Sequence, residues 1–310
     1  MPKNKSEIRK DYLLDQHVII TPSRLKRPKD VKAEKVTKNS PNCPFCVDNL
    51  DKKNIVDRIN KENSKKWQVV SINNIFPAVT LNNKKAYGKQ EVIIETPDHG
   101  LDLADLSEKQ IYTVLKMYSQ RTKALSKNKN LDYILCFKNH GVKAGASLKH
   151  SHSQVFASSF VPKELKEEAE LAKDYKINNN SCVYCDVLKK EKKSKRKVFE
   201  DKNIVSFTPY ASKYHYEVWI FPKRHLDNIT LLNKGELMSF SKVLKIITKK
   251  LQALNIDYNF FLHNVVSNTT QHFYIKIQPR DSIWAGVELG SGLVINSISP
   301  EVAAKYYREK

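Results

Sequence analysis

His150-Ser151-His152-Ser153-Gln154 is the stretch of this sequence that is most informative about its fold. Alternate residues of an extended strand point to the same side, so the two imidazoles are expected about 7 Å apart on one face of a sheet. One ring can then bind a metal ion while the other faces a substrate. A neutral imidazole is a competent nucleophile when a hydrogen bond fixes its second ring nitrogen. We therefore predict His150 as a metal ligand and His152 as a nucleophile; two structural histidines on a sheet are the alternative.

An incomplete copy of this stretch, Gln271-His272-Phe273-Tyr274, stands near the end of the chain, and other motifs also occur twice in the same order. Each half holds a Cys-x-x-Cys pair, a β-rich run, a helix-like segment and then the histidine motif. The interval from Glu91 to His99 is 99 − 91 = 8 residues. The interval from Glu217 to His225 is also 225 − 217 = 8 residues. Such self-similarity is typical of a duplicated unit, and we predict two units at residues 1–165 and 166–310.

Local signals predict one long helix in each unit. Ser107 followed by Gln110 has the form of a capping box, and apolar residues follow at helical spacing. Asn233 with Glu236 repeats this start signal in the second half. Short β-rich runs lie around both segments, at residues 18–20, 67–71, 91–96, 204–207 and 273–277. The predicted fold class is α+β, with two tandem units that each combine a mainly antiparallel sheet with a long helix.

Two Cys-x-x-Cys pairs, each followed by histidines, predict two metal sites. A tetrahedral Zn²⁺ site takes four nitrogen or sulfur ligands, and a close cysteine pair supplies two of them from one turn. In the first unit the predicted ligands are Cys43, Cys46, His99 and His150. By the repeat, those of the second unit are Cys182, Cys185, His225 and His272. A redox dithiol is the alternative, but neither pair opens a helix in a thioredoxin-like pattern.

Composition restricts the classes of protein that this chain can be. The 310 residues carry 54 Lys and Arg against 33 Asp and Glu, a formal charge of +21. Lys far outnumbers Arg and is spread along the whole chain, which favours a solvated lysine-rich surface over a nucleic-acid groove. No apolar run approaches the roughly 20 residues that span a bilayer, and the N-terminus has no secretory pattern. We therefore expect a cytoplasmic protein that binds no membrane.

A run of small residues precedes the histidine motif. Residues 141–147, Gly-Val-Lys-Ala-Gly-Ala-Ser, allow backbone amides and the Ser147 hydroxyl to approach a phosphate closely. The sequence thus pairs a candidate nucleophile with a candidate phosphate-binding loop.

At this point the sequence resembles the galactose-1-phosphate uridylyltransferases and their relatives in the histidine-triad superfamily. The resemblance extends over nearly the whole chain. Its motifs are Val-Ile-Ile-Thr-Pro-Ser-Arg-Leu-Lys-Arg-Pro at 18–28, Cys-Pro-Phe-Cys at 43–46, Asn-Ile-Phe-Pro-Ala at 74–78, Glu-Thr-Pro-Asp-His at 95–99, Phe-Lys-Asn-His-Gly at 137–141, the His-Ser-His-Ser-Gln stretch, and Trp-Ala-Gly-Val-Glu-Leu-Gly at 284–290.

The resemblance implies a ping-pong reaction in which His152 attacks the α-phosphorus of a nucleoside diphosphate sugar. Sugar phosphate leaves, and a second phosphate-bearing substrate takes the nucleotide from the histidine. The positions that match nucleotide- or phosphate-binding residues of the family are Arg24, Arg27, Asn74 and Asn139. Ser147 and Gln154 are placed to donate hydrogen bonds to the phosphoryl oxygens, where charge develops. Hydrolase branches of the superfamily have histidine where this chain has Gln154, and glutamine cannot move protons at neutral pH. Transfer is therefore favoured over hydrolysis.

Departures from the family pattern concern mainly the second unit. Tyr274 stands where the repeat requires a second nucleophile. Lys276 and Gln278 stand near positions where well-known bacterial relatives have iron-binding histidines, so a second zinc is expected instead, as in ADP-glucose phosphorylase-like relatives. Val287 replaces a family tyrosine near the substrate phosphate, which leaves the sugar and the base open.

Three functions remain as hypotheses. The first is UDP-glucose:hexose-1-phosphate uridylyltransferase, an enzyme of galactose metabolism, and family relatives imply a homodimer. The second is an ADP-sugar or dinucleoside polyphosphate phosphorylase, which uses inorganic phosphate as the acceptor. The third, from another class, is a non-catalytic zinc-stabilised RNA-binding protein, motivated by the charge of +21 and by Tyr274.

Overall fold

The computed structural model describes residues 7–20, 43–265 and 271–309. Arg24 and Arg27 lie outside the described residues. The first half contains the strands β1 (Glu7–Lys10), β2 (His17–Ile20), β3 (Ile55–Asn60), β4 (Trp67–Asn73), β5 (Gly88–Ile94), β6 (Tyr133–His140) and β7 (His152–Ser158), and the helix α1 (Glu108–Leu125). The second contains the helices α2 (Lys163–Asn179), α3 (Val183–Glu191), α4 (Lys234–Ala253), α5 (Gly286–Ser291) and α6 (Pro300–Arg308), and the strands β8 (Lys197–Glu200), β9 (Ile204–Phe207), β10 (Val218–Pro222), β11 (Tyr258–His263), β12 (Tyr274–Pro279) and β13 (Val294–Asn296).

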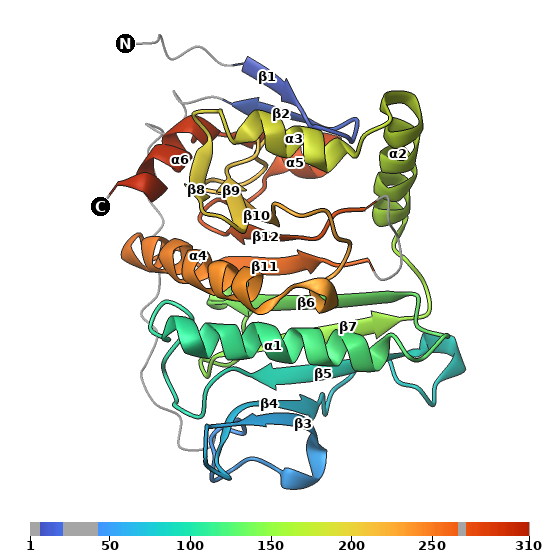
Figure 1. Ribbon diagram of the computed structural model, residues 1–310, viewed down its shortest axis with the longest axis vertical. Helices are drawn as coiled ribbons and strands as arrows, with labels where there is room; N and C mark the ends of the chain where they lie inside the picture. Colours follow the sequence, from blue (N-terminus) through green and yellow to red (C-terminus); the bar gives the residue numbers. More distant parts are fainter. Residues whose placement is uncertain (1–6, 21–42, 266–270, 310) are drawn as a thin grey trace.

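One ten-stranded antiparallel sheet runs through both halves, in the order β3-β4-β5-β7-β6-β11-β12-β10-β9-β8 (Figure 1). The two halves meet where β6 pairs with β11. Outward from this pair the strand orders are β6-β7-β5-β4-β3 and β11-β12-β10-β9-β8, so the five strands of each half are connected in the same way. The predicted α+β fold of two similar units is therefore confirmed. The predicted boundary between residues 165 and 166 falls in the first turn of α2 and stays a prediction.

Helices α1 and α4 lie side by side over one face of this sheet (Figure 1). Their apolar sides pack on alternate strand residues, such as Ile93 of β5 and Ile220 of β10, in one large core. Ser107 accepts a hydrogen bond from the amide of Gln110 at the start of α1. Asn233 and Glu236 form a reciprocal capping box at the start of α4. Both predicted long helices thus begin where their capping signals placed them.

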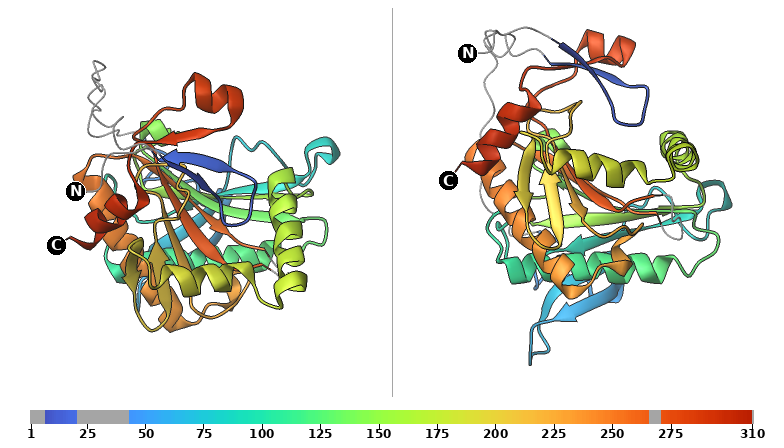
Figure 2. Two further views of the ribbon diagram at one scale, coloured as in Figure 1. Left: turned by 90° about the horizontal axis from the view of Figure 1, so that it is seen from above. Right: turned by 45° about the horizontal axis from the view of Figure 1, so that its top comes forward.

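The opposite face of the sheet carries different coverings in the two halves. In the first half, Val92 and Ile94 of β5 pack against the turn that holds Cys43 and Phe45. In the second half, Trp219, Phe221 and Tyr274 pack against α3. A small three-stranded sheet of β1, β2 and β13 lies over the second half, and α5 lies on the side away from α1 (Figure 2). Among the described residues, no helix is both long enough and apolar enough to cross a bilayer.

The repeat contains a difference in register that the equal intervals did not reveal. Glu91 points to the helix side, where Arg121 of α1 donates two hydrogen bonds to it. Glu217 lies on the opposite face and accepts a hydrogen bond from the indole of Trp219. A strand alternates its faces with every residue, so a shift of one residue exchanges them. The two glutamates that match in sequence are therefore not equivalent in the fold.

The capping box of α4 provides a test of local stability. We expect Asn233→Ala to lower the free energy of unfolding by about 1 kcal/mol, because the amide of Glu236 loses its acceptor. Lys249→Ala, at an exposed position of the same helix, is the control and should change stability by less than about 0.5 kcal/mol. Urea denaturation of both variants measures the difference. Equal stabilities of the two variants would show that the box contributes nothing.

Candidate active site

Two thiols and two imidazoles meet at one edge of the first half. Cys43, Cys46, His99 and His150 place one ligand atom each within 4.8 Å of the others. Nδ1 of His150 lies 3.7 Å from Sγ of Cys43 and 3.7 Å from Sγ of Cys46, while Nδ1 of His99 lies 3.4 Å from Sγ of Cys46. This donor set is one that a tetrahedral metal ion prefers. The structure thus gathers the four residues predicted from the sequence into a cluster that can bind a metal.

Local structure fixes each of these side chains. The amide of Cys46 donates to the carbonyl of Cys43, which closes the turn that brings both thiols to one side. The Nε2–H of His150 donates to the carbonyl of Thr96, 2.8 Å away, so Nδ1 keeps its lone pair for a metal. Burial lowers the pKa of His150 and raises the pKa of Cys46. The sequence did not predict the role of Thr96, because its backbone carbonyl, and not its side chain, makes this hydrogen bond.

His152 lies next to this cluster, at the first position of β7, and is 8% exposed. Its Nδ1 lies 2.8 Å from the carbonyl of His150. A carbonyl can only accept, so Nδ1 carries the proton and Nε2 carries the lone pair. Burial lowers the pKa of His152 below its usual range, against the raising effect of this hydrogen bond, so the ring is neutral at pH 7. The imidazole therefore has the tautomer that attack on an electrophile requires.

Three polar residues from β7, β5 and the end of β4 are linked by hydrogen bonds beside His152. Gln154 of β7 accepts a hydrogen bond from Nε2 of Gln90 in β5 at 3.2 Å. The NH₂ group of Gln154 is then left as a donor. The backbone amide of Asn74, just after β4, donates to the carbonyl of Gln90. The structure thus brings Asn74 and Gln154 close together through Gln90. Sequence reasoning missed Gln90, because a glutamine inside a strand carries no pattern of its own.

Asn139 of β6 and the loop that follows it lie on the other side of β7 from β5. Oδ1 of Asn139 accepts from Nδ2 of Asn259, which also bonds the carbonyl of Ala144. Gly141 and Gly145 have positive φ values of 80° and 85°. A Cβ on Gly141 would lie 2.0 Å from a carboxylate oxygen of Asp257, so only glycine fits there. Ser147 follows on this loop and is exposed, as a group that contacts a ligand should be.

A second metal-type cluster lies in the other half, where Cys182, Cys185 and His225 come within 4.8 Å of one another. Nδ1 of His225 lies 3.4 Å from Sγ of Cys185, and a hydrogen bond with Cys185 lowers the pKa of Cys182 to about 6. The predicted fourth ligand, His272, is outside this group of three. Its ring centroid is 5.1 Å from that of His225, much as His150 and His99 are 5.2 Å apart. Nε2 of His272 is buried and has no hydrogen-bond partner among the described residues.

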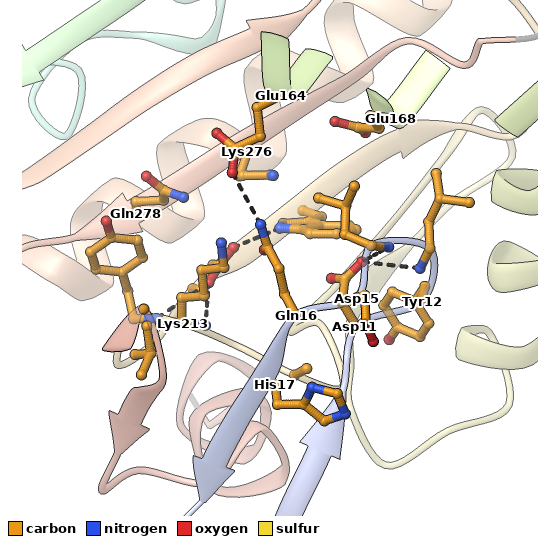
Figure 3. A pocket seen from close by; sticks show the side chains of 18 of the residues that line it. Asp11, Tyr12, Asp15, Gln16, His17, Glu164, Glu168, Lys213, Lys276 and Gln278 are labelled. Carbon is orange, nitrogen blue, oxygen red and sulfur yellow. Dashed lines mark hydrogen bonds between the residues drawn. The ribbon is translucent and has the colours of Figure 1, made fainter. Parts of the chain in front are cut away.

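Tyr274 occupies the position in the second half that His152 occupies in the first. It is the first residue of β12, is fully buried, and donates a hydrogen bond to Oε1 of Glu168. Beside it lies a cavity of about 770 Å³, and Lys276 and Gln278 are among its lining residues (Figure 3). The ammonium of Lys276 lies 4.7 Å from the ring centroid of Trp219. This half therefore has a tyrosine at the position of His152, and a lysine and a glutamine line the cavity beside it.

Comparison with known proteins finds relatives of one family that cover nearly the whole chain. A family model described as galactose-1-phosphate uridyl transferase, N-terminal domain, matches residues 2–162, just over half of the 310 residues. A model described as a domain of unknown function matches residues 102–306. The chain is 31% identical to the galactose-1-phosphate uridylyltransferase of Thermotoga maritima, over 98% of both proteins. It is 30% identical to the ADP-glucose phosphorylase of Arabidopsis thaliana, over 98% of this chain and 92% of that one.

Solved structures agree with the sequence relatives. The crystal structure of an ADP-glucose phosphorylase from Arabidopsis thaliana with bound ADP-glucose superposes with a TM-score of 0.86 at 30% identity, over 99% of both chains. The structure of a uridylyltransferase superposes with a TM-score of 0.76 at 28% identity, over 98% of both chains. Matched along nearly its whole length in sequence and in fold, the chain belongs to the galactose-1-phosphate uridyl transferase family.

Proposed function

We propose that this protein is a nucleotidyltransferase that carries a nucleotide on His152 between two phosphate-bearing substrates. The observation that supports this most is the hydrogen bond from Nδ1 of His152 to the carbonyl of His150. It leaves the lone pair on Nε2, and burial keeps the ring neutral. A nucleoside diphosphate sugar is the proposed donor substrate.

In the first step, Nε2 of His152 attacks the α-phosphorus. A bond from nitrogen to phosphorus forms, and the bond from phosphorus to the bridging oxygen breaks, so sugar 1-phosphate leaves with that oxygen. In the second step, a phosphate oxygen of the acceptor attacks the same phosphorus, and the histidine leaves with its electron pair. Both leaving groups are weakly basic at neutral pH, so no proton needs to be moved to them. Gln154, which cannot act as a general acid, fits this chemistry.

Fixed donors are needed where charge develops on the phosphoryl oxygens. The NH₂ group of Gln154 is one such donor, because Gln90 engages its oxygen. We assign Ser147 and Asn139 to the phosphates and Asn74 to the nucleotide. Arg24 and Arg27 are assigned to phosphate as well, because the planar guanidinium matches phosphate oxygens. The second half contributes structure and substrate binding, since Tyr274 replaces the nucleophile.

Zinc is the metal that we propose for both clusters. Its ligands in the first half are Cys43, Cys46, His99 and His150, and the bound ion would stabilise the turn and the histidine segment. In the second half, Cys182, Cys185 and His225 are joined by His272, whose buried Nε2 lacks a hydrogen-bond partner among the described residues. We propose that the protein works as a homodimer, as the family resemblance implies.

Two acceptors are consistent with this site. The leading proposal is exchange between UDP-glucose and galactose 1-phosphate, which suits the 31% identity to a galactose-1-phosphate uridylyltransferase. The second is phosphorolysis of ADP-glucose by inorganic phosphate, favoured by the TM-score of 0.86 to an ADP-glucose phosphorylase. Membership in a family of nucleotidyltransferases argues against the hypothesis of a non-catalytic RNA-binding protein.

Replacing the nucleophile is the first test. We expect His152→Ala to reduce turnover of the nucleotide sugar by about 10⁴-fold or more, because no other group takes the nucleotide. Lys116→Ala, at an exposed position of α1 on the opposite face of the sheet, should retain the full rate. A steady-state assay of sugar phosphate release compares the two. Turnover by His152→Ala within tenfold of the unsubstituted protein would contradict the assignment.

The metal assignment predicts two zinc ions per chain by elemental analysis of the purified protein. Cys43→Ser should lose one ion and most of the turnover, because His150 then no longer holds the segment of His152. Cys182→Ser should lose the other ion and keep more of the turnover, because its cluster lies in the half without a nucleophile. Iron in either cluster, or full activity of Cys43→Ser without its metal, would be inconsistent with this assignment.

The choice of acceptor is tested with two donor and acceptor pairs. We expect turnover of UDP-glucose with galactose 1-phosphate, and little with ADP-glucose and inorganic phosphate. Chromatography of the nucleotide products distinguishes the pairs, since transfer yields UDP-galactose and phosphorolysis yields ADP. The reverse preference would reject the leading proposal and establish the phosphorylase.

A further inference from the structure

Behind the histidine segment, on the side of α1, lies a lysine that the proposed mechanism does not use. Lys138 of β6 is 1% exposed, although lysine is rarely buried without a partner. Its Nζ lies 2.7 Å from Oε2 of Glu95 and 3.3 Å from Oδ1 of Asp102. Burial lowers the pKa of Lys138, but Asp102 and Glu95 outweigh it, so the pKa is raised and the group is charged.

Two further acceptors of Lys138 belong to the histidine segment itself. Nζ donates to Oγ of Ser151 at 3.0 Å and to the carbonyl of His152 at 3.2 Å. Oγ of Ser151 in turn donates to Oε2 of Glu95, 2.5 Å away. The amide of Glu95 donates to the carbonyl of Ser151. Lys138 and Glu95 thus bind both the backbone and the side chain of the residues that carry the candidate nucleophile.

The remaining neighbours hold the ion pair in place. The hydroxyl of Tyr118, from α1, donates to Oε1 of Glu95 at 3.1 Å. Asp102 accepts from Nδ1 of His140 at 2.7 Å, and that histidine stacks on Tyr258. Burying an ion pair is a poor way to gain stability, since a well-packed apolar pair of similar volume is often as stable or more so. The contacts to Ser151 and His152 therefore call for another explanation.

That explanation lies in the orientation of the His152 ring. His150 is held from one side by the thiols and by the carbonyl of Thr96. The sheet holds the backbone of the two residues that follow, through the pairing of His152 with Ile94 and the hydrogen bond from Glu95 to Ser151, but the thiols and Thr96 do not contact them. Lys138 holds them from the other side of the sheet, and a hydrogen bond to the carbonyl of His150 then sets the ring. The direction of Nε2 depends on both restraints.

We propose that Lys138 is a positioning residue for nucleotide transfer, which aligns Nε2 of His152 with the α-phosphorus by holding the backbone from Ser151 to His152. It touches no substrate, because its side chain points to the α1 side of the sheet. The proposal rests on the proposed function of His152. A misplacement of about 1 Å at a reacting atom can cost about 10²-fold in rate.

A double variant, Lys138→Met with Glu95→Gln, removes these two charges together and leaves Asp102 with its hydrogen bond to His140. A matched control is Arg121→Met with Glu91→Gln. It removes a comparable buried pair between β5 and α1 that makes no hydrogen bond to the histidine segment. Each is tested as the full chain with its metal content measured. Rapid-quench kinetics at saturating nucleotide sugar then give the rate of adduct formation on His152, and titration gives the dissociation constant of the nucleotide.

In the Lys138 double variant we expect adduct formation to slow by about 10- to 100-fold, with metal content and dissociation constant changed by less than about twofold. The Arg121 double variant should keep the rate within about twofold. Equal slowing in both variants, or a full rate in the first, would overturn the proposal. Absence of any adduct in the unsubstituted protein would instead refute the proposed function.

Ser151→Ala is the second variant, for the case that the double variant does not fold. It removes one acceptor of Lys138 and leaves the ion pair intact, so the protein should remain folded. We expect adduct formation to slow by about 3- to 10-fold at an unchanged dissociation constant. Ser153→Ala, two residues further along the chain and outside the contacts of Lys138, is its control. Equal rates for the two serine variants would also overturn the proposal.

Discussion

The hydrogen bond from Nδ1 of His152 to the carbonyl of His150 is the interaction on which the rest of the first unit depends. It makes one residue serve two purposes, because the ring of His150 faces the two thiols while its backbone orients the next histidine. The carbonyl of Thr96 leaves the lone pair of His150 on Nδ1, which faces the thiols. The carbonyl of His150 leaves the lone pair of His152 on Nε2, and burial lowers the pKa of that ring. A metal ion bound by the two thiols and by His99 and His150 would therefore support the proposed nucleophile without contacting the substrate.

The two halves show how one architecture can retain its framework and lose a reactive group. Both present five strands in the same order and a cysteine–histidine cluster at the corresponding place. At the position of His152, however, the second half has Tyr274, whose hydroxyl is bonded to Glu168 and whose pKa burial raises well above its usual value. A neutral, buried phenol is a poor nucleophile. The duplicated half thus contributes to the shared sheet, and the proposed transfer chemistry is assigned to the first half.

The sequence correctly predicted those features that depend on residues close together in the chain. The capping residues Ser107 and Asn233 predicted the starts of both long helices, and the cysteine spacing predicted the metal-type clusters. The sequence did not predict the register of the corresponding strands. The intervals from Glu91 to His99 and from Glu217 to His225 are equal, yet the two glutamates face opposite sides of the sheet. Lys138 was missed because a lysine between a phenylalanine and an asparagine resembles a surface residue. Only the pairing of distant strands brings Glu95 and Asp102 to it.

The central claim is that a single ring nitrogen carries the nucleotide between substrates. The most direct measurement is mass spectrometry of the protein after incubation with a nucleotide sugar and no acceptor, followed by peptide mapping under alkaline conditions that preserve phosphoramidates. We predict an added mass of one nucleoside monophosphate, located on His152, which disappears when the acceptor is supplied. An unmodified protein that nevertheless turns over both substrates, or a nucleotide located on any other residue, would contradict this mechanism.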